Sequence, residues 1–246
     1  MSKLGWTAIG GFAVGFVGLG LTMALGAEEW RRFRLDDFLS SAACEPDTDG
    51  VGAPNGEERR WTWTGGDAVV IAVPGTVHYR GGEGNEVIVR GPADLVSRVR
   101  VRGDEIKLCK GAARGSGLDI TLPGRPFKSM AVAGSTDMTL ENVTTSDLKI
   151  AVAGSGKLRA QGRSDKVDLV IAGSGDADLS ELDMEKLKLN IAGSGHVDAG
   201  PKDTLDLNIA GSGRLRLLNK PSHVESSIVG SGKIVQVADG ETKSGD

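Results

Sequence analysis

The sequence predicts an all-β protein, a right-handed parallel β-helix in which the chain winds into coils of about 19 residues. Three observations carry this prediction: a tripeptide that repeats at a nearly constant period, apolar residues at every second position around it, and an unusual glycine content. Glycine accounts for 37 of the 246 residues, whereas aromatic residues make up only 4%. The core is therefore expected to consist of aliphatic side chains on stacked strands.

Residues 1–27 are predicted to form an N-terminal transmembrane anchor or signal helix. The run 4–27 carries no charged side chain, and a helix of this length spans about 36 Å, more than the roughly 30 Å of bilayer hydrocarbon. The length favours an uncleaved anchor. The small residues Ala24 and Gly26 also suit the cleavage site of a signal peptide, which stays the alternative.

Two opposing signals bear on the side of the membrane where the remaining chain lies. The basic residues after the apolar run, Arg31, Arg32 and Arg34, outnumber Lys3 before it, and basic residues favour the cytoplasmic side. An N-terminal apolar segment usually directs export of the chain that follows, and we favour export. The expected location is the cell envelope, either anchored in the inner membrane and facing the periplasm, or secreted to the periplasm or cell surface.

Residues 28–60 are predicted to connect the membrane segment to the folded domain. Residues 28–43 suit a short juxtamembrane helix, and residues 44–60 suit a linker rich in Gly, Pro and Asp. The linker contains Cys44 and the folded domain contains Cys109. In an exported protein both cysteines enter an oxidising compartment, where a disulfide between them and two free thiols are both open alternatives.

The stretch 61–127 is predicted to contain strands with only weak repeats. Apolar and polar residues alternate in five places, which indicates half-buried strands at 69–73, 87–89, 99–101, 106–108 and 120–122. If the solenoid covers all of 61–237, it holds about nine coils stacked about 4.8 Å apart. Residues 238–246 are predicted to be a polar tail.

The tripeptide that repeats is Gly-Ser-Gly, once Gly-Ser-Thr, and successive copies begin 18 to 20 residues apart. A strand, a full helix and their turns need more residues than this, so each repeat is predicted to be one coil of strands. The serine hydroxyls are expected to form hydrogen bonds from coil to coil. The first glycine of each copy is expected to let the chain turn a corner: Gly134, Gly154, Gly173, Gly193, Gly211 and Gly230.

Residues at fixed offsets from these glycines form columns that should stack. Even offsets are apolar, which indicates strands with one face in the core. The column two residues before the glycine is Val132, Val152, Ile171, Ile191, Ile209 and Ile228. Odd offsets carry charges of mixed sign, as outward columns in register require. One such column is Lys149, Asp168, Lys188, Asp206 and Glu225.

The repeat series resembles a known family. The segments AVAGST, AVAGSG, IAGSG and IVGSG, preceded by IAVPGTVHYR and LDITLPGRPFKSMAVAGS, are similar to the putative auto-transporter adhesin, head GIN domain family over about residues 61–237. The resemblance implies a single-domain parallel β-helix in a bacterial envelope or surface protein. The family name implies adhesion, and the resemblance carries over no catalytic residues.

Two groups near the start of the domain are predicted to bind a ligand. Arg98, Arg100 and Arg102 alternate with valines, which places three guanidinium groups about 7 Å apart on one outer strand face. Such a row suits the sulfate, phosphate or uronate groups of an anionic surface polymer, with solvated edge charges as the alternative. Trp61 and Trp63 are expected either to stack on a sugar or partner protein or to cover an open end of the solenoid.

A grid of outward residues on two adjacent coils is the candidate metal site. Asp176 and Asp178 lie on one coil, and His196 and Asp198 have the same offsets on the next. Neighbours on adjacent coils lie about 5 Å apart, a spacing at which carboxylates bind a divalent cation or hydrolyse a glycosidic bond. Basic residues one coil below and one coil above also predict a solvated, charge-balanced face.

Composition and motifs together predict a protein that is not an enzyme and has no cofactor. The net charge of −4 argues against a nucleic-acid binder, and two cysteines with three histidines leave little material for catalysis. The predicted function is that of a membrane-tethered extracytoplasmic β-helix for adhesion, surface-polymer binding or envelope scaffolding. Its expected partners are the membrane, an anionic surface polymer or envelope protein, and a second copy of itself.

Two other functions stay open at this level. A carbohydrate-active β-helix enzyme would use the face that carries Asp176, Asp178 and Asp198. A cytoplasmic membrane-attached scaffold would follow from the opposite membrane orientation.

Overall fold

The computed structural model describes residues 50–52, 56–109 and 117–237. The predicted anchor or signal segment 1–27, the predicted helix 28–43 and the predicted tail 238–246 lie outside these residues. Within the described part of the chain, no helix is both long enough and apolar enough to cross a membrane.

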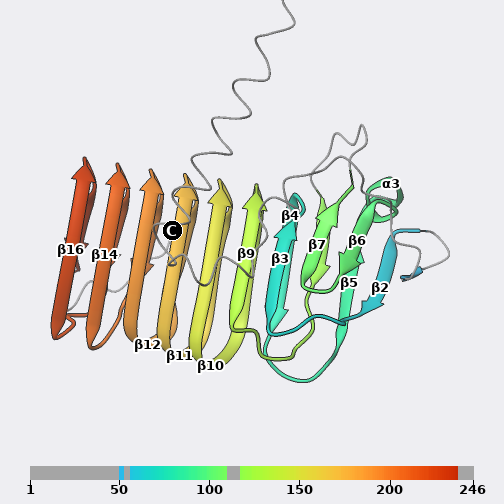
Figure 1. The fold of residues 1–246 in the computed structure, drawn as a ribbon, viewed down its shortest axis with the longest axis horizontal. Helices are drawn as coiled ribbons and strands as arrows, with labels where there is room; N and C mark the ends of the chain where they lie inside the picture. Colours follow the sequence, from blue (N-terminus) through green and yellow to red (C-terminus); the bar gives the residue numbers. More distant parts are fainter. Residues whose placement is uncertain (1–49, 53–55, 110–116, 238–246) are drawn as a thin grey trace, which may run out of the picture. The chain divides into compact units, whose positions relative to one another are not determined.

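The described chain is an all-β solenoid whose strands stack in parallel (Figure 1). The Gly-Ser-Gly stretch forms its regular part and makes about five turns, which confirms the predicted class of fold. The handedness of the coil stays a prediction. The strands of the regular part are β9 (Ser129–Gly134), β10 (Thr136–Gly154), β11 (Lys157–Gly173), β12 (Asp176–Gly193), β13 (His196–Ala199), β14 (Thr204–Gly211), β15 (Arg214–Leu217), β16 (His223–Gly230) and β17 (Lys233–Gln236).

The predicted register of these coils is confirmed. Ile191 pairs with Ile171 on one side and with Ile209 on the other, and all three side chains are at most 2% exposed. In the outward direction, Lys149 pairs with Asp168. Each buried isoleucine contributes roughly 1.5–3 kcal/mol relative to an exposed one, so the aliphatic columns hold the stack in this register.

The first glycine of each repeat makes the corner that the sequence predicts. All six have a positive φ, and Gly193, for example, has φ +134°. The amide of Ser194 then donates a hydrogen bond of 2.9 Å to the carbonyl oxygen of Gly173 in the preceding coil. The predicted coil-to-coil bonds therefore come from the serine amides, and no serine hydroxyl of the described repeats makes them. The hydroxyls point into solvent, because these serines are exposed.

The stretch before the repeats is also made of strands, but their order differs from the prediction. β3 (Ala68–Ala72) and β4 (Gly75–Arg80) stack in parallel on β9 and β10. β7 (Glu105–Leu108) and β8 (Leu118–Thr121) stack beyond them. The coils therefore do not follow chain order, and the expectation of nine successive coils is wrong.

Antiparallel strands close the N-terminal end of the solenoid. β6 (Val99–Arg102) pairs antiparallel with β7. β5 (Glu86–Arg90) pairs antiparallel with β8 and with β2 (Glu58–Thr62), and β2 also pairs antiparallel with the short β1 (Val51–Gly52). The helix α3 (Ala93–Val96) adds two buried side chains, Leu95 and Val96. A reversed strand cannot continue a parallel coil, so the stack ends here.

Candidate functional site

Two of the three arginines predicted to bind an anion, Arg100 and Arg102, belong to β6, and Arg98 directly precedes this strand. Val99 and Val101 point into the core and are 0% and 9% exposed. Arg98 and Arg100 are half-buried, and Arg102 is exposed. Because side chains alternate along a strand, Arg100 and Arg102 share the solvent side. Arg98 lies in the turn before the strand, and its Nη1 atom is shielded from solvent. Within the described residues β6 pairs only with β7, so the row lies on an edge strand.

Lys107 extends this row across the hairpin, and the sequence analysis did not single it out. The hairpin pairs Arg100 directly with Lys107, whose Nζ lies 3.0 Å from Oε2 of Glu105. A signal for this pairing was present in the sequence. Two alternating segments joined by the two residues Gly-Asp at 103–104 are typical of a tight β-hairpin.

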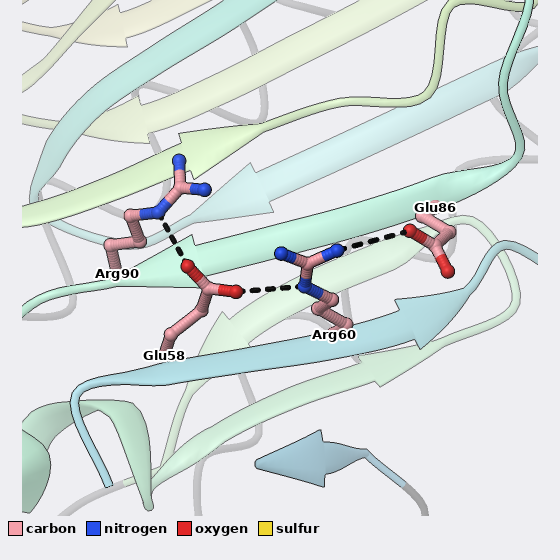
Figure 2. A network of polar contacts seen from close by, with 4 residues as sticks. All are labelled: Glu58, Arg60, Glu86 and Arg90. Atoms are coloured by element: carbon pink, nitrogen blue, oxygen red, sulfur yellow. Dashed lines mark hydrogen bonds and ion pairs between the residues drawn. The ribbon is translucent and has the colours of Figure 1, made fainter. Parts of the chain in front are cut away.

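The arginines of the β6 row form no ion pair with any carboxylate of the described residues. Other arginines near this end of the solenoid do have such partners (Figure 2). The Nε atoms of Arg60 and Arg90 each lie 2.7 Å from an oxygen of Glu58, and these hydrogen bonds lower the pKa of the Glu58 carboxyl. The arginines of the β6 row therefore differ from Arg60 and Arg90 in forming no such ion pair, although Glu105 is the cross-strand neighbour of Arg102.

One nitrogen of the β6 row also lacks a hydrogen-bond acceptor. The Nη1 atom of Arg98 is shielded from solvent and has no partner in the described structure. A buried donor without an acceptor costs roughly 1–3 kcal/mol, and more when the group is charged. Because this nitrogen is shielded, a ligand reaches it only if the Arg98 side chain moves.

The four residues of the predicted metal site occupy adjacent positions, as their register requires. Asp176 pairs with His196, and Asp178 pairs with Asp198. His196 and Asp176 interact directly, with 3.3 Å between Nδ1 and Oδ1. These residues line an open depression of about 370 Å³ on β10 to β13.

Basic side chains neutralise the two remaining carboxylates of this grid. Oδ2 of Asp178 lies 3.6 Å from Nη2 of Arg159, and Oδ2 of Asp198 lies 3.3 Å from Nη1 of Arg216. The predicted charge balance is therefore present. In the part of the chain that the structure describes, no group of three His, Cys, Asp or Glu side chains is placed to hold a metal ion. The metal site stays a prediction.

Trp61 and Trp63 lie in the core, where neither ring has a free face for a sugar. They are 5% and 2% exposed. Trp63 packs edge-on against Phe127 with 5.7 Å between ring centroids, and Arg59 lies 5.0 Å from the ring centroid of Trp61. This burial corrects their assignment as ligand-binding residues. It agrees with the alternative that they cover the end of the solenoid.

Comparison with known proteins identifies relatives of this fold. Residues 85–221 match the family model for the putative auto-transporter adhesin, head GIN domain. A putative adhesin from Bacteroides fragilis is 16% identical, with 78% of this chain and 99% of that chain covered and a TM-score of 0.58. A putative lipid binding protein from Parabacteroides distasonis is 20% identical, with coverages of 76% and 98% and a TM-score of 0.47. No curated protein matches the chain.

These comparisons bear on fold and on family in different ways. The structure from Bacteroides fragilis is similar in fold, and its 16% identity says nothing further about this chain. The family match spans more than half of the sequence and includes β6, its partner β7 and most of the regular coils. The resemblance carried by the repeat series is thereby confirmed. This chain belongs to the putative auto-transporter adhesin, head GIN domain family.

Proposed function

We propose that this chain is a non-enzymatic, adhesin-like protein of the bacterial envelope that binds an anionic surface polymer at β6. The observation that carries the proposal is that Arg98, Arg100 and Arg102 lie on or directly before the edge strand β6 without ion-pair partners among the described carboxylates. Guanidinium groups pair with sulfate, phosphate and carboxylate through two parallel hydrogen bonds. A strand orders these groups before binding, so less conformational entropy is lost.

An envelope location is supported by three observations. The family carries the description of a putative auto-transporter adhesin, and the apolar run 4–27 suits an anchor or an export signal. Cys109 is disulfide-bonded, and disulfides persist in oxidising compartments such as the periplasm and the cell surface. The other cysteine of the sequence, Cys44, lies outside the described residues. We therefore assign the solenoid to the periplasmic or outer side of the membrane, tethered by residues 4–27.

The Asp176–Asp198 face supports a structural role better than a hydrolytic one. Retaining glycosidases need two carboxyl groups, one that acts as the general acid and one that acts as the nucleophile. Here Asp178 and Asp198 are held by Arg159 and Arg216 on the neighbouring coils. Ion pairs that alternate across coils stabilise the stack and leave little net charge for a ligand.

Binding to immobilised polygalacturonate and dextran sulfate, with uncharged dextran as reference, tests the β6 proposal on the purified full chain. Each exposed contact contributes roughly 0.2–1 kcal/mol. The triple variant Arg98→Ala, Arg100→Ala, Arg102→Ala should therefore bind about 3- to 150-fold more weakly. Binding by the wild type should also weaken as salt rises, because exposed charges are screened beyond about 8 Å at physiological ionic strength.

A matched triple variant controls for the loss of net charge. Arg159→Ala, Arg214→Ala and Arg216→Ala remove three arginines from the outward columns of β11 and β15. This variant should bind like the wild type, since those positions lie away from β6. Equal weakening by both triple variants, binding that ignores salt, or equal binding to uncharged dextran would overturn the proposal.

A further inference from the structure

The last coil of the solenoid exposes apolar side chains that the coils before it cover. Five large hydrophobic residues are exposed in the described chain, and four of them belong to β16 and β17. These four are Val224, Ile228, Val229 and Val235, which are 48%, 38%, 70% and 45% exposed. Val224 and Ile228 continue core columns that hold the buried Leu205 and Ile209 one coil earlier. The C-terminal end is therefore an uncovered cross-section of the core.

The backbone at this end also has unpaired strand edges. Figure 1 shows β16 at the end of the stack, beside β14. In the described residues, β16 pairs only with β14, and β17 pairs only with β15. The free edge of each strand carries N–H and C=O groups without ladder partners, which is a template for adding another strand. The N-terminal end is closed by antiparallel strands and buried tryptophans. The N-terminal end thus has a covered core although β6 is an edge strand, whereas the core at the C-terminal end is uncovered.

We propose that a second copy of this chain covers the C-terminal end, with the two β16 strands paired antiparallel across a two-fold axis. Because only the C-terminal end leaves core columns uncovered, the two C-terminal ends meet, and the assembly closes at two copies instead of growing into a filament. The residues 238–246 that follow in the sequence are polar apart from one alanine, so they supply no apolar cover. The proposal does not depend on polymer binding at β6.

The sequence of β16 selects one register for this pairing. Directly opposite residues of antiparallel strands share a face, so core residues must meet core residues. Placing Ser226 opposite the partner's Ser226 sets Val224 against the partner's Ile228 and Glu225 against the partner's Ser227. The apolar column then continues into the second copy. The serine that interrupts the core column gains a hydroxyl partner on the same face.

Two neighbouring registers also set core residues opposite core residues, but each brings less favourable side chains together. A pairing centred on Glu225 sets two carboxylates directly opposite each other, which is destabilising. A pairing centred on Ser227 sets the hydroxyl of Ser226 against the partner's Ile228. The self-complementarity of this strand, together with its exposed apolar residues, is the reason to choose a second copy as the occupant.

Sedimentation of the purified full chain in detergent at micromolar concentration tests the assembly. The wild type should be a dimer. Val224→Lys, which puts a charge on the core side of the edge strand, should convert most of it to monomer. Ser227→Lys adds the same charge on the outer side, opposite the partner's Glu225, and should leave the dimer intact. A monomeric wild type, a larger polymer, or a Val224→Lys variant that stays dimeric would overturn the proposal, with far-ultraviolet circular dichroism showing that each variant is folded.

Cysteine cross-linking tests the register independently. Ser226→Cys should form a covalent dimer on mild oxidation, because the two copies of residue 226 face each other. Ser227→Cys should not, since the two copies of residue 227 are offset by two positions and lie beyond the roughly 7 Å that a disulfide spans between Cα atoms. The native Cys109 is already disulfide-bonded and does not compete. Failure of Ser226→Cys to cross-link, or equal cross-linking at 227, would refute the register.

Discussion

Replacing Gly193 with alanine should destabilise the solenoid more than the same change at Gly134, although both glycines open a repeat. Their φ angles, +134° and +104°, both favour glycine. They differ in what an added Cβ would meet. At Gly134 nothing lies within 4 Å, whereas at Gly193 the Cβ would press on the carbonyl oxygen of Gly173. That oxygen accepts the 2.9 Å hydrogen bond from Ser194.

The size of the difference follows from these two environments. Backbone strain costs about 1–3 kcal/mol and is common to both variants. Only Gly193→Ala also forces neighbouring coils apart, for which overpacking costs about 1–3 kcal/mol, and it weakens a hydrogen bond worth about 1 kcal/mol. We therefore expect Gly193→Ala to lose about 2 kcal/mol more stability than Gly134→Ala. For a domain of this size that corresponds to about 4–8 °C in the midpoint of thermal unfolding.

Thermal unfolding of the wild type and both variants, followed by circular dichroism, measures this difference. Hydrogen exchange at the amide of Ser194 adds a local reading, because that amide should lose protection only in Gly193→Ala. Equal midpoints for the two variants, or unchanged protection of Ser194, would refute the reasoning. Either result would mean that the coils do not approach each other at this corner as closely as the structure indicates.

Three further predictions test a core column, a buried phenol and an ion pair. Ile191→Asp should lower the unfolding midpoint far more than Asn190→Asp, because Ile191 is 2% exposed and Asn190 faces outward; equal midpoints would contradict the register. Tyr79, the only tyrosine, should ionise above its ordinary range because burial raises its pKa. The neutral phenol therefore stabilises the folded state below pH 10, and this contribution is lost as the pH rises through the folded pKa. Tyrosinate absorbance that appears already at its ordinary pKa would contradict this burial. Hydrogen bonds from Arg60 and Arg90 lower the pKa of Glu58, so their contribution to stability is lost as the pH falls through the folded pKa. Glu58→Gln should therefore make stability depend less on pH on the acid side. An unchanged dependence of stability on pH would argue against the ion pairs of Glu58.

The regular coils could be predicted because the Gly-Ser-Gly tripeptide repeats along the chain. Residues at the same offset from successive copies are therefore expected to stack on adjacent coils. The offset of a residue from its glycine gives both its face and its partner, as the pair of Lys149 and Asp168 shows. A slip of one residue would turn a whole isoleucine column toward solvent. Periodicity and burial therefore point to a single register, and Ile171 and Ile191 meet in it.

The order of the N-terminal strands could not be predicted from the same kind of signal. Alternation gives the buried face of each strand but neither its partner nor its direction. β3 lies between β7 and β9, although β7 follows it in the chain and β9 comes much later. β5 and β6 run antiparallel to their neighbours and end the stack. These pairings join distant segments, so they depend on the total surface buried rather than on any local pattern.

For the candidate site, the sequence placed side chains on faces but did not identify their partners. The outward direction of Arg100 and Arg102 follows from alternation alone. Their lack of carboxylate partners among the described residues depends on the strand beside them, where Glu105, the cross-strand neighbour of Arg102, pairs with Lys107 instead. The same limitation applies to the two tryptophans. Alternation predicts that both side chains share one face of the strand. The pairing of β2 with the antiparallel strand β5 turns this face toward the core.

The positions of the β6 row and of the open end have a joint consequence for binding. Eight successive pairings separate β6 from β16 on the same sheet, or about 38 Å at 4.8 Å per strand. A dimer joined at β16 would therefore carry two basic rows about 80 Å apart, at its two far ends. Two weak sites on one rigid body gain about 10²- to 10⁴-fold in avidity on a polymer long enough to reach both, and gain nothing on a short oligomer. Val224→Lys should thus weaken binding to a long anionic polymer although it lies far from β6, and should leave binding to a short anionic oligosaccharide unchanged. Loss of both kinds of binding would place residue 224 in the ligand site itself, and loss of neither would separate polymer binding from assembly.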